Sequence, residues 1–143
     1  RSENFWSECL RGQEMNTLMQ VTLFSKDFIG LSEFYRTVFD LSENEELRSD
    51  VFRGYMAGQC MVGFSALAAY EMLGLDPREK GDGDQTALTF SIESTEKLDT
   101  AVSESVKKGA TIIKDPFTTY YHWYLAVLRD PDGNAFRLAC TTP

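Results

Sequence analysis

The chain is short of positive charge. Its 14 Lys and Arg residues are outnumbered by 22 Asp and Glu residues, which gives a formal net charge of -8. Proteins that bind nucleic acid do so with clustered cations, which this composition does not supply. We therefore expect no nucleic-acid partner. The overall charge mildly favours a cationic small molecule.

Cysteine and long apolar runs are also scarce. The chain has 3 cysteines (Cys9, Cys60 and Cys140), which are widely spaced and form no C-x-x-C motif, so neither a disulfide framework nor a zinc ribbon is expected. No run approaches the roughly 20 apolar residues of a membrane span, and no signal-peptide pattern opens the chain. The expectation is a cytoplasmic protein with free thiols and no membrane partner.

Residues 1–14 form an N-terminal extension that lacks an initial Met. Its apolar residues recur at helical spacing, so it is interpreted either as a short docking helix or as a non-native segment, with Met15 as a plausible native start.

The clearest local pattern predicts a β-hairpin over 120–140. Two β-prone runs flank a turn at Asp130–Asn134, where Pro131 presets a turn φ and Gly133 supplies a positive one. Alternation along the strands places His122 on one face and a set of large side chains on the other. That second set is Tyr121, Trp123, Leu125, Val127 and, from the returning strand, Arg137.

A strand, a cap and a helix occur twice. Strands over 17–24 and 86–91 are followed by caps at Asp27 and Ser94 and by helices at about 28–40 and 95–108, and the caps are 94 − 27 = 67 residues apart. The remaining predicted elements are strands over 51–57, 60–65 and 110–114, a loop or edge strand over 41–50, a short helix over 67–73 and a connector over 76–84. Each half therefore has the pattern βαβββ, and the fold class is α+β.

These features resemble the vicinal oxygen chelate superfamily, which includes glyoxalase I, bleomycin-resistance proteins, fosfomycin-resistance enzymes and extradiol dioxygenases. The resemblance covers about 15–141. The residues that carry it are Gln20–Asp27 with Phe34-Tyr35-Arg36, Gly109-Ala110 with Pro116-Phe117, and above all Leu128–Asn134 with its DPDGN turn. It implies a single domain over 15–143, made of tandem modules at about 15–75 and 85–143. Their curled mixed sheet would surround a cleft, with helices outside, and a homodimer is common.

The resemblance also implies where a metal would bind. Metal-dependent members use His or Gln on the first strand, His at its counterpart in the second half, and Glu on the last strand. This sequence has Gln20, Ala87 and Arg137 there, and the fourth position, near Gly63–Ser65, offers no His or carboxylate. A guanidinium repels a cation. We therefore expect no metal and no cofactor.

No catalytic set is apparent either. The predicted hairpin turns His122, the one histidine, away from the cleft, and Cys60 and Cys140 resemble small core residues. The catalytic residues are therefore unknown. If the superfamily topology holds, the cleft is lined by Gln20, Thr22, Phe24, Ala87, Thr89, Tyr121, Trp123, Leu125, Val127 and Arg137.

The leading hypothesis is a metal-independent small-molecule-binding protein, in which an aromatic groove holds a planar or aromatic ligand. Gln20 and Arg137 would orient that ligand. The aromatics could equally fill the sheet interior or a dimer interface, and Arg137 could pair with a ligand anion or with an acid such as Glu71. Two alternatives stay open: a lyase, isomerase or dioxygenase-like enzyme of the same superfamily, and an interaction module with a closed cleft.

Overall fold

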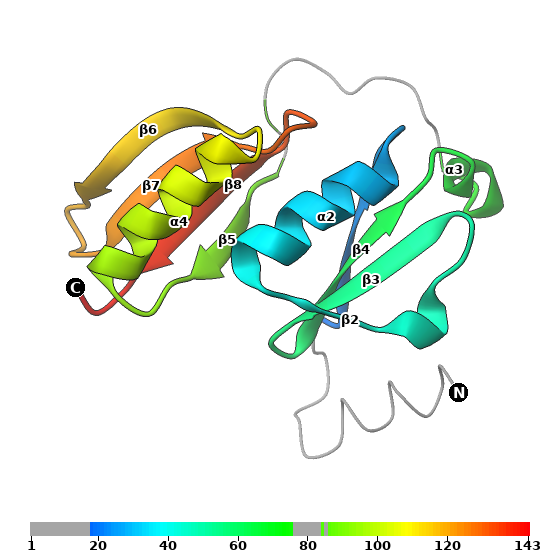
Figure 1. The fold of residues 1–143 in the computed structure, drawn as a ribbon, viewed down its shortest axis with the longest axis horizontal. Coiled ribbons are helices and arrows are strands. Elements are labelled where there is room, and N and C mark those ends of the chain that lie inside the picture. The colour runs from blue at the N-terminus through cyan, green and yellow to red at the C-terminus, as the bar shows by residue number, and fades with distance from the viewer. Residues whose placement is uncertain (1–17, 76–83, 85) are drawn as a thin grey trace. The chain divides into compact units, whose positions relative to one another are not determined.

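The computed structural model describes residues 18–75, 84 and 86–143 (Figure 1). The chain divides into two compact units, Arg1–Arg78 and Glu79–Pro143. The predicted extension over 1–14, Cys9 and residues 76–83 of the predicted connector over 76–84 lie outside the described residues. None of the helices in the described ranges is long and apolar enough to cross a membrane.

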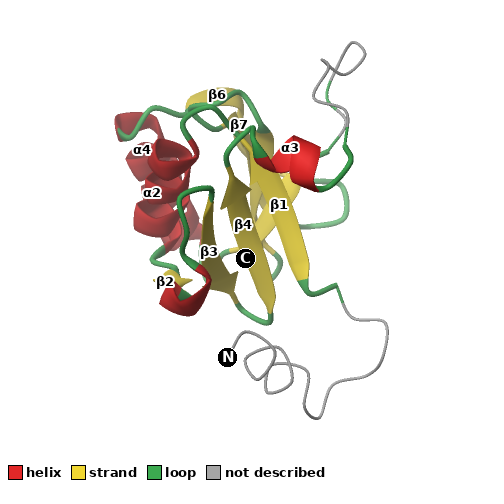
Figure 2. Cartoon of the chain, turned by 90° about the vertical axis from the view of Figure 1, so that its right-hand side faces the viewer, coloured by secondary structure: helices red, strands yellow, loops and turns green. Residues whose placement is uncertain are grey.

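The first module has one mixed sheet with a helix on one face, as Figure 2 shows for α2. Its strands lie in the order β1-β4-β3-β2, with β1 parallel to β4 and the other pairs antiparallel. The elements are β1 (Gln20–Phe24), α2 (Phe28–Phe39), β2 (Ser42–Glu43), the 3₁₀ helix η1 (Glu45–Leu47), β3 (Phe52–Ala57), β4 (Cys60–Ser65) and α3 (Ala69–Met72).

The second module repeats this topology in the order β5-β8-β7-β6, with α4 across its sheet (Figure 1). Its elements are β5 (Leu88–Ser91), α4 (Thr95–Lys107), β6 (Thr111–Thr118), β7 (Tyr124–Arg129) and β8 (Ala135–Cys140). The predicted α+β fold of two tandem βαβββ modules is therefore confirmed.

The two sheets share one pairing register. Thr22 is paired with Gly63 in the first module, and Thr89 is paired with Arg137 in the second. The first strands are 89 − 22 = 67 residues apart, whereas the last strands are 137 − 63 = 74 residues apart. The second module is thus seven residues longer between these strands (74 − 67 = 7), which explains why the later strands lose the sequence offset.

Both predicted caps are present. The Asp27 carboxylate accepts a hydrogen bond from the Gly30 N–H at 2.9 Å, and the Ser94 hydroxyl accepts one from the Lys97 N–H at 3.2 Å. Such bonds satisfy N–H groups that the first turn of a helix leaves without partners. Tyr35 of α2 is fully buried.

The buried faces of the two helices do not follow side-chain polarity alone. Ser32 of α2 is 1% exposed, and its hydroxyl is satisfied by donating to the Ile29 carbonyl. Val106 of α4 is 44% exposed, because the buried stripe of that helix runs through Leu98, Val102 and Ser105. The Ser105 hydroxyl donates to the Ala101 carbonyl at 2.7 Å, which makes its burial possible.

The hairpin of β7 and β8 is confirmed, and the DPDGN turn has a structural role. Asp130 is 3% exposed, and its carboxylate accepts hydrogen bonds from the backbone N–H groups of Asp132 and Asn134 at 2.8 and 2.9 Å. The Asn134 side-chain amide donates to the other carboxylate oxygen at 3.0 Å. Next to the turn, the Arg129 guanidinium forms a two-point ion pair with Asp84 at 2.7 and 2.9 Å.

The first strand of this hairpin begins later than the alternation predicted. Tyr121, His122 and Trp123 precede β7 in a tight turn, in which the Thr119 N–H donates to the Trp123 carbonyl at 2.8 Å. The Thr119 hydroxyl accepts from the Trp123 N–H at 3.0 Å, and His122 has a φ of 69°. The assignment of Tyr121 and His122 to opposite strand faces was therefore wrong, since neither is in a strand. β6 instead extends beyond its predicted end to Thr118, with register shifts on both sides of Lys114.

Candidate functional site

Each sheet has a distal face, defined as the face turned away from its helix. In the second module the Tyr124 hydroxyl donates to Asp99 of α4 at 2.8 Å, so Tyr124 and the residues alternating with it point toward the helix. The odd-numbered residues of β7 therefore lie on the distal face. Strand pairing adds the residues opposite them, and this face carries Thr89, Leu125, Val127, Arg137 and Ala139.

Arg137 is the chemically distinctive residue of this face. It is half-buried, and its Nε donates to the Thr89 hydroxyl at 2.9 Å. Among the described residues of its own module, no carboxylate forms an ion pair with it. The two Nη groups of this fixed guanidinium are thus available to an anion. Glu71, the other predicted partner, belongs to the first module, and its pairing with Arg137 stays a prediction.

Aromatic side chains gather in the turn before β7. The ring centroids of Tyr121 and Trp123 are 5.2 Å apart with an interplanar angle of 78°, and those of Tyr120 and Tyr121 are 4.9 Å apart at 88°. Tyr121 is 41% exposed and Trp123 is half-buried. Leu125 is only 4% exposed, so it can support neighbouring side chains but offers little surface to a ligand.

The first module brings Gln20 and Thr22 together. The Gln20 side-chain amide donates to the Thr22 hydroxyl at 2.9 Å, and both residues are half-buried. Phe24, at the end of β1, instead stacks on Tyr70, with ring centroids 4.2 Å apart and an interplanar angle of 19°. Figure 2 shows α3, which carries Tyr70, beside this end of β1. Phe24 therefore has an intramolecular partner for one ring face.

Sequence reasoning missed Phe52, whose ring lies over Gly54 and Gly63 on the distal face of the first sheet. The available signal was the pair of glycines inside two predicted strands, because such glycines often mark a close approach by another group.

The four positions at which the superfamily resemblance implies a metal do not offer a metal-binding donor set here. Gln20 is the single residue among them with an amide or carboxylate oxygen. The fourth position, near Gly63–Ser65, has no His or carboxylate, Ala87 has a methyl group, and Arg137 carries a positive charge. Over residues 18–75, 84 and 86–143, no group of three His, Cys, Asp or Glu side chains is arranged to hold a metal ion. A divalent cation does not fit this chemistry.

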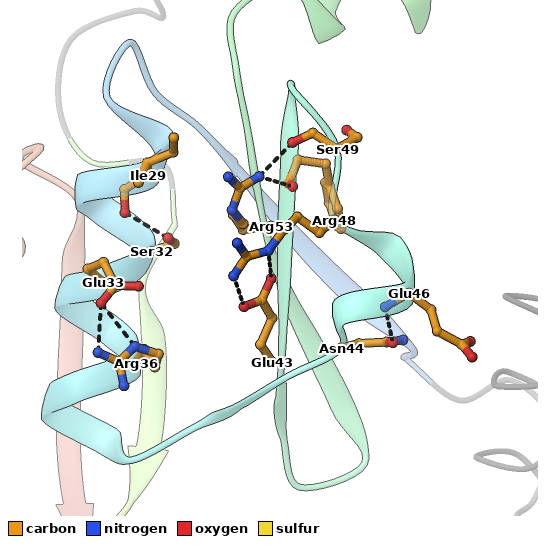
Figure 3. A network of polar contacts seen from close by, with 11 residues as sticks. Ile29, Ser32, Glu33, Arg36, Glu43, Asn44, Glu46, Arg48, Ser49 and Arg53 are labelled. Carbon is orange, nitrogen blue, oxygen red and sulfur yellow. Dashed lines mark hydrogen bonds and ion pairs between the residues drawn. The ribbon is translucent and has the colours of Figure 1, made fainter.

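A group of charged side chains lies on and beside α2 and forms ion pairs within itself (Figure 3). Glu43 binds Arg48 at 2.8 and 2.5 Å, and Glu33 binds Arg36 at 2.7 Å. The hydrogen bonds from Arg48 lower the pKa of Glu43, and those from Arg36 lower the pKa of Glu33. These carboxylates stay ionised and have partners, so the group stabilises the module and is a poor candidate for acid–base catalysis.

The remaining candidates for a nucleophile or base are also weak. Burial raises the pKa of the Cys60 thiol, which reduces the fraction of reactive thiolate at neutral pH. Cys140 is fully buried, and His122 is in the exposed turn. The distal faces, with Arg137 in one module and Gln20, Thr22 and Phe52 in the other, are therefore the candidate functional surfaces.

Comparison with known proteins agrees with this fold. The family model described as Glyoxalase/Bleomycin resistance protein/Dioxygenase superfamily matches residues 17–138. A solved glyoxalase/bleomycin resistance protein/dioxygenase family enzyme from Burkholderia phytofirmans PsJN is 40% identical, with a TM-score of 0.81 over 85% of this chain and 96% of that one. No protein with a curated description matches the chain in sequence.

More distant structures share the fold. Lactoylglutathione lyase from Agrobacterium tumefaciens is 19% identical, with a TM-score of 0.66 over 89% of this chain and 95% of that one. The fosfomycin resistance protein FosX from Mesorhizobium loti is 17% identical, with a TM-score of 0.65 over 90% and 95%. The family match spans most of the chain, so the protein belongs to the glyoxalase/bleomycin resistance/dioxygenase superfamily, the vicinal oxygen chelate superfamily.

Proposed function

We propose that this protein binds a planar or aromatic small molecule that carries an anionic group, and that it does so without a metal. The observation that carries the proposal is the Arg137 guanidinium, which Thr89 holds at 2.9 Å on the distal face of the second sheet. The superfamily resemblance implies a carboxylate at this position in metal-dependent relatives. Replacing an anion by a cation changes the preferred ligand from a metal ion to an anion.

The chemistry of the second module is suited to an aromatic anion. Arg137 supplies charge-assisted hydrogen bonds, while Tyr121 and Trp123 supply ring surfaces for stacking. Val127 is the strand partner of Arg137, and Trp123 lies four residues before Val127. Four residues of extended chain span about 13 Å. The long Arg and Trp side chains can span part of that separation, so a ligand of two fused rings is a suitable probe.

The net charge of -8 lowers the association rate of an anionic ligand, because the protein repels it at long range. Contact chemistry depends on the local group, and Arg137 sets that chemistry here. The ligand's affinity is therefore expected to depend on Arg137, while its association rate rises with added salt.

The test is calorimetric binding of 2-naphthoate and of its neutral analogue 2-naphthamide to protein treated with a chelator. Arg137→Gln should weaken naphthoate binding about tenfold or more, since a hydrogen bond to a charged group contributes about 1.5–3 kcal/mol. It should change naphthamide binding much less. Lys107→Gln, which removes one charge from the exposed last turn of α4, is the matched control. Equal naphthoate affinity in wild type and Arg137→Gln, or no saturable binding by wild type, would refute the proposal.

One observation favours a second function, namely an enzyme of the same superfamily. The 40% identical protein from Burkholderia phytofirmans PsJN is described as a family enzyme. In that case Gln20 and Tyr121 are the polar candidates for catalysis. Lyase, isomerase and dioxygenase assays with added Ni²⁺, Zn²⁺, Mn²⁺ or Fe²⁺ test it, and metal-dependent turnover would replace the binding function.

Cytoplasmic location and homodimer formation are further parts of the proposal. Light scattering of the purified chain tests the dimer, because a monomer mass at micromolar concentration would contradict it.

A further inference from the structure

Two glycines face each other in the first sheet. Gly54 of β3 is directly paired with Gly63 of β4, and neither has a positive φ. Their backbone conformation is therefore open to any residue, and glycine destabilises the interior of a strand relative to alanine. Something other than backbone geometry requires glycine at both positions.

The ring of Phe52 imposes that requirement at Gly63 and shares it with Met61 at Gly54. A Cβ atom added to Gly63 would lie 2.7 Å from Cε1 and 2.9 Å from Cζ of Phe52, and one added to Gly54 would lie 2.9 Å from Phe52 Cε2 and 2.7 Å from Met61 Sδ. The ring thus occupies the side-chain space of both glycines and lies across the pair. Phe52 is half-buried, so part of its surface is still accessible.

A polar group lies beside the ring. The position of a Gly63 Cβ is also 2.9 Å from Gln20 Nε2, and the Gln20 amide is held by its hydrogen bond to Thr22 at 2.9 Å. That bond uses one of the two N–H groups and leaves the amide oxygen as an acceptor. The same small area therefore offers a ring face and an oriented amide.

The equivalent pair in the second module has different chemistry. Gly54 and Gly63 correspond in register to Val127 and Arg137, which are also directly paired. The same position in the repeat thus carries an aromatic ring over glycines in one module and a cation in the other. We infer that the first module holds a ring-binding subsite, in which Phe52 stacks on a flat aromatic group and Gln20 hydrogen-bonds a polar substituent at its edge.

This inference rests on the proposed function and names a second ligand-binding surface of the chain, which lies within the first module. A purely structural alternative exists, because a ring over glycines also shields their backbone from water. The two roles differ in what loss of the ring would change. If the ring only shields the backbone, its loss changes stability alone, whereas loss of a subsite weakens the affinity for aromatic probes in protein that is still folded.

The experiment is binding of 2-naphthamide to folded wild type, Phe52→Leu and Phe39→Leu. Leu keeps most of the apolar volume and removes the ring face, and Phe39, a half-buried residue of α2, is the matched control for loss of a ring elsewhere in the same module. Phe52→Leu should weaken naphthamide binding roughly three- to tenfold, and Phe39→Leu should leave it unchanged. NMR with labelled phenylalanine should show contacts between the Phe52 ring and the probe.

Other outcomes separate the two proposals. If Arg137→Gln weakens naphthoate binding but Phe52→Leu leaves naphthamide binding unchanged and no Phe52 contacts are seen, the ring subsite is wrong and the proposed function stands. If wild type binds naphthoate but not naphthamide, the ring subsite is again overturned. If neither probe binds, both proposals fail.

Discussion

Replacing Gly63 by alanine is expected to disturb the first distal face in a way that can be worked out from the structure. The new Cβ would lie 2.7 Å from Phe52 Cε1, whereas ordinary contact begins at 3.4 Å, so the ring must retreat by about 3.4 − 2.7 = 0.7 Å. Overpacking of this kind costs about 1–3 kcal/mol. The change from Gly to Ala also stabilises the folded state by about 0.5–1 kcal/mol, because it lowers the conformational entropy of the unfolded chain. The expected net loss is therefore about 0–2.5 kcal/mol of unfolding free energy, with a central value of about 1 kcal/mol.

The assay is urea unfolding of wild type, Gly63→Ala, Phe52→Ala and the double variant. If the ring causes the loss, removing it makes room for the new methyl group, and the double variant loses less stability than the sum of the single variants. A coupling of about 1 kcal/mol is expected. Additivity within about 0.5 kcal/mol would refute the placement of Phe52 over Gly63.

Two further predictions concern groups away from the distal faces. Glu43→Gln should lower the unfolding free energy by about 1 kcal/mol at pH 7, because the Glu43 side chain is 10% exposed and bound to Arg48. Glu93→Gln, which breaks the exposed pair with Lys97, should lower it less, because solvent screens that pair. Since the pKa of Glu43 is lowered on folding, its contribution is complete above about pH 4.5 and is lost as the pH falls through the folded value, so urea titrations of the two variants should converge with wild type in acid. Asp130→Ala should lower the unfolding free energy by about 2–3 kcal/mol, because it removes the buried acceptor of the turn. Asp130→Asn should lower it less, because one side-chain oxygen remains. Equal losses of stability for the two variants in thermal unfolding would contradict this role.

Local patterns predicted most of the fold. Strand alternation, the caps at Asp27 and Ser94 and the turn at Asp130–Asn134 depend on residues close in sequence, and each was placed to within a few residues. The turn before β7 was misassigned because Tyr120–Tyr124 is rich in residues that favour strands. Hydrogen bonds to Thr119 overrode that propensity.

The site was less accessible to sequence reasoning. Arg137 and Thr89 were placed together because strand parity and the superfamily resemblance determined their faces. Phe52 was missed because its role depends on the pairing of Gly54 with Gly63. The register between two strands cannot be predicted from the sequence of either strand by itself. The partner of Phe24 was missed for a similar reason, since Tyr70 reaches it from α3.

The claim that Arg137 has replaced a metal ligand is tested most directly by measuring naphthoate affinity against metal. Protein purified without chelator would be analysed for bound metal, then titrated with 2-naphthoate before and after chelator treatment and after addition of Ni²⁺, Zn²⁺ or Mn²⁺. We expect substoichiometric metal and the same affinity in every case. One metal ion per chain, with naphthoate affinity or catalytic turnover that disappears on chelation and returns with metal, would contradict the proposal.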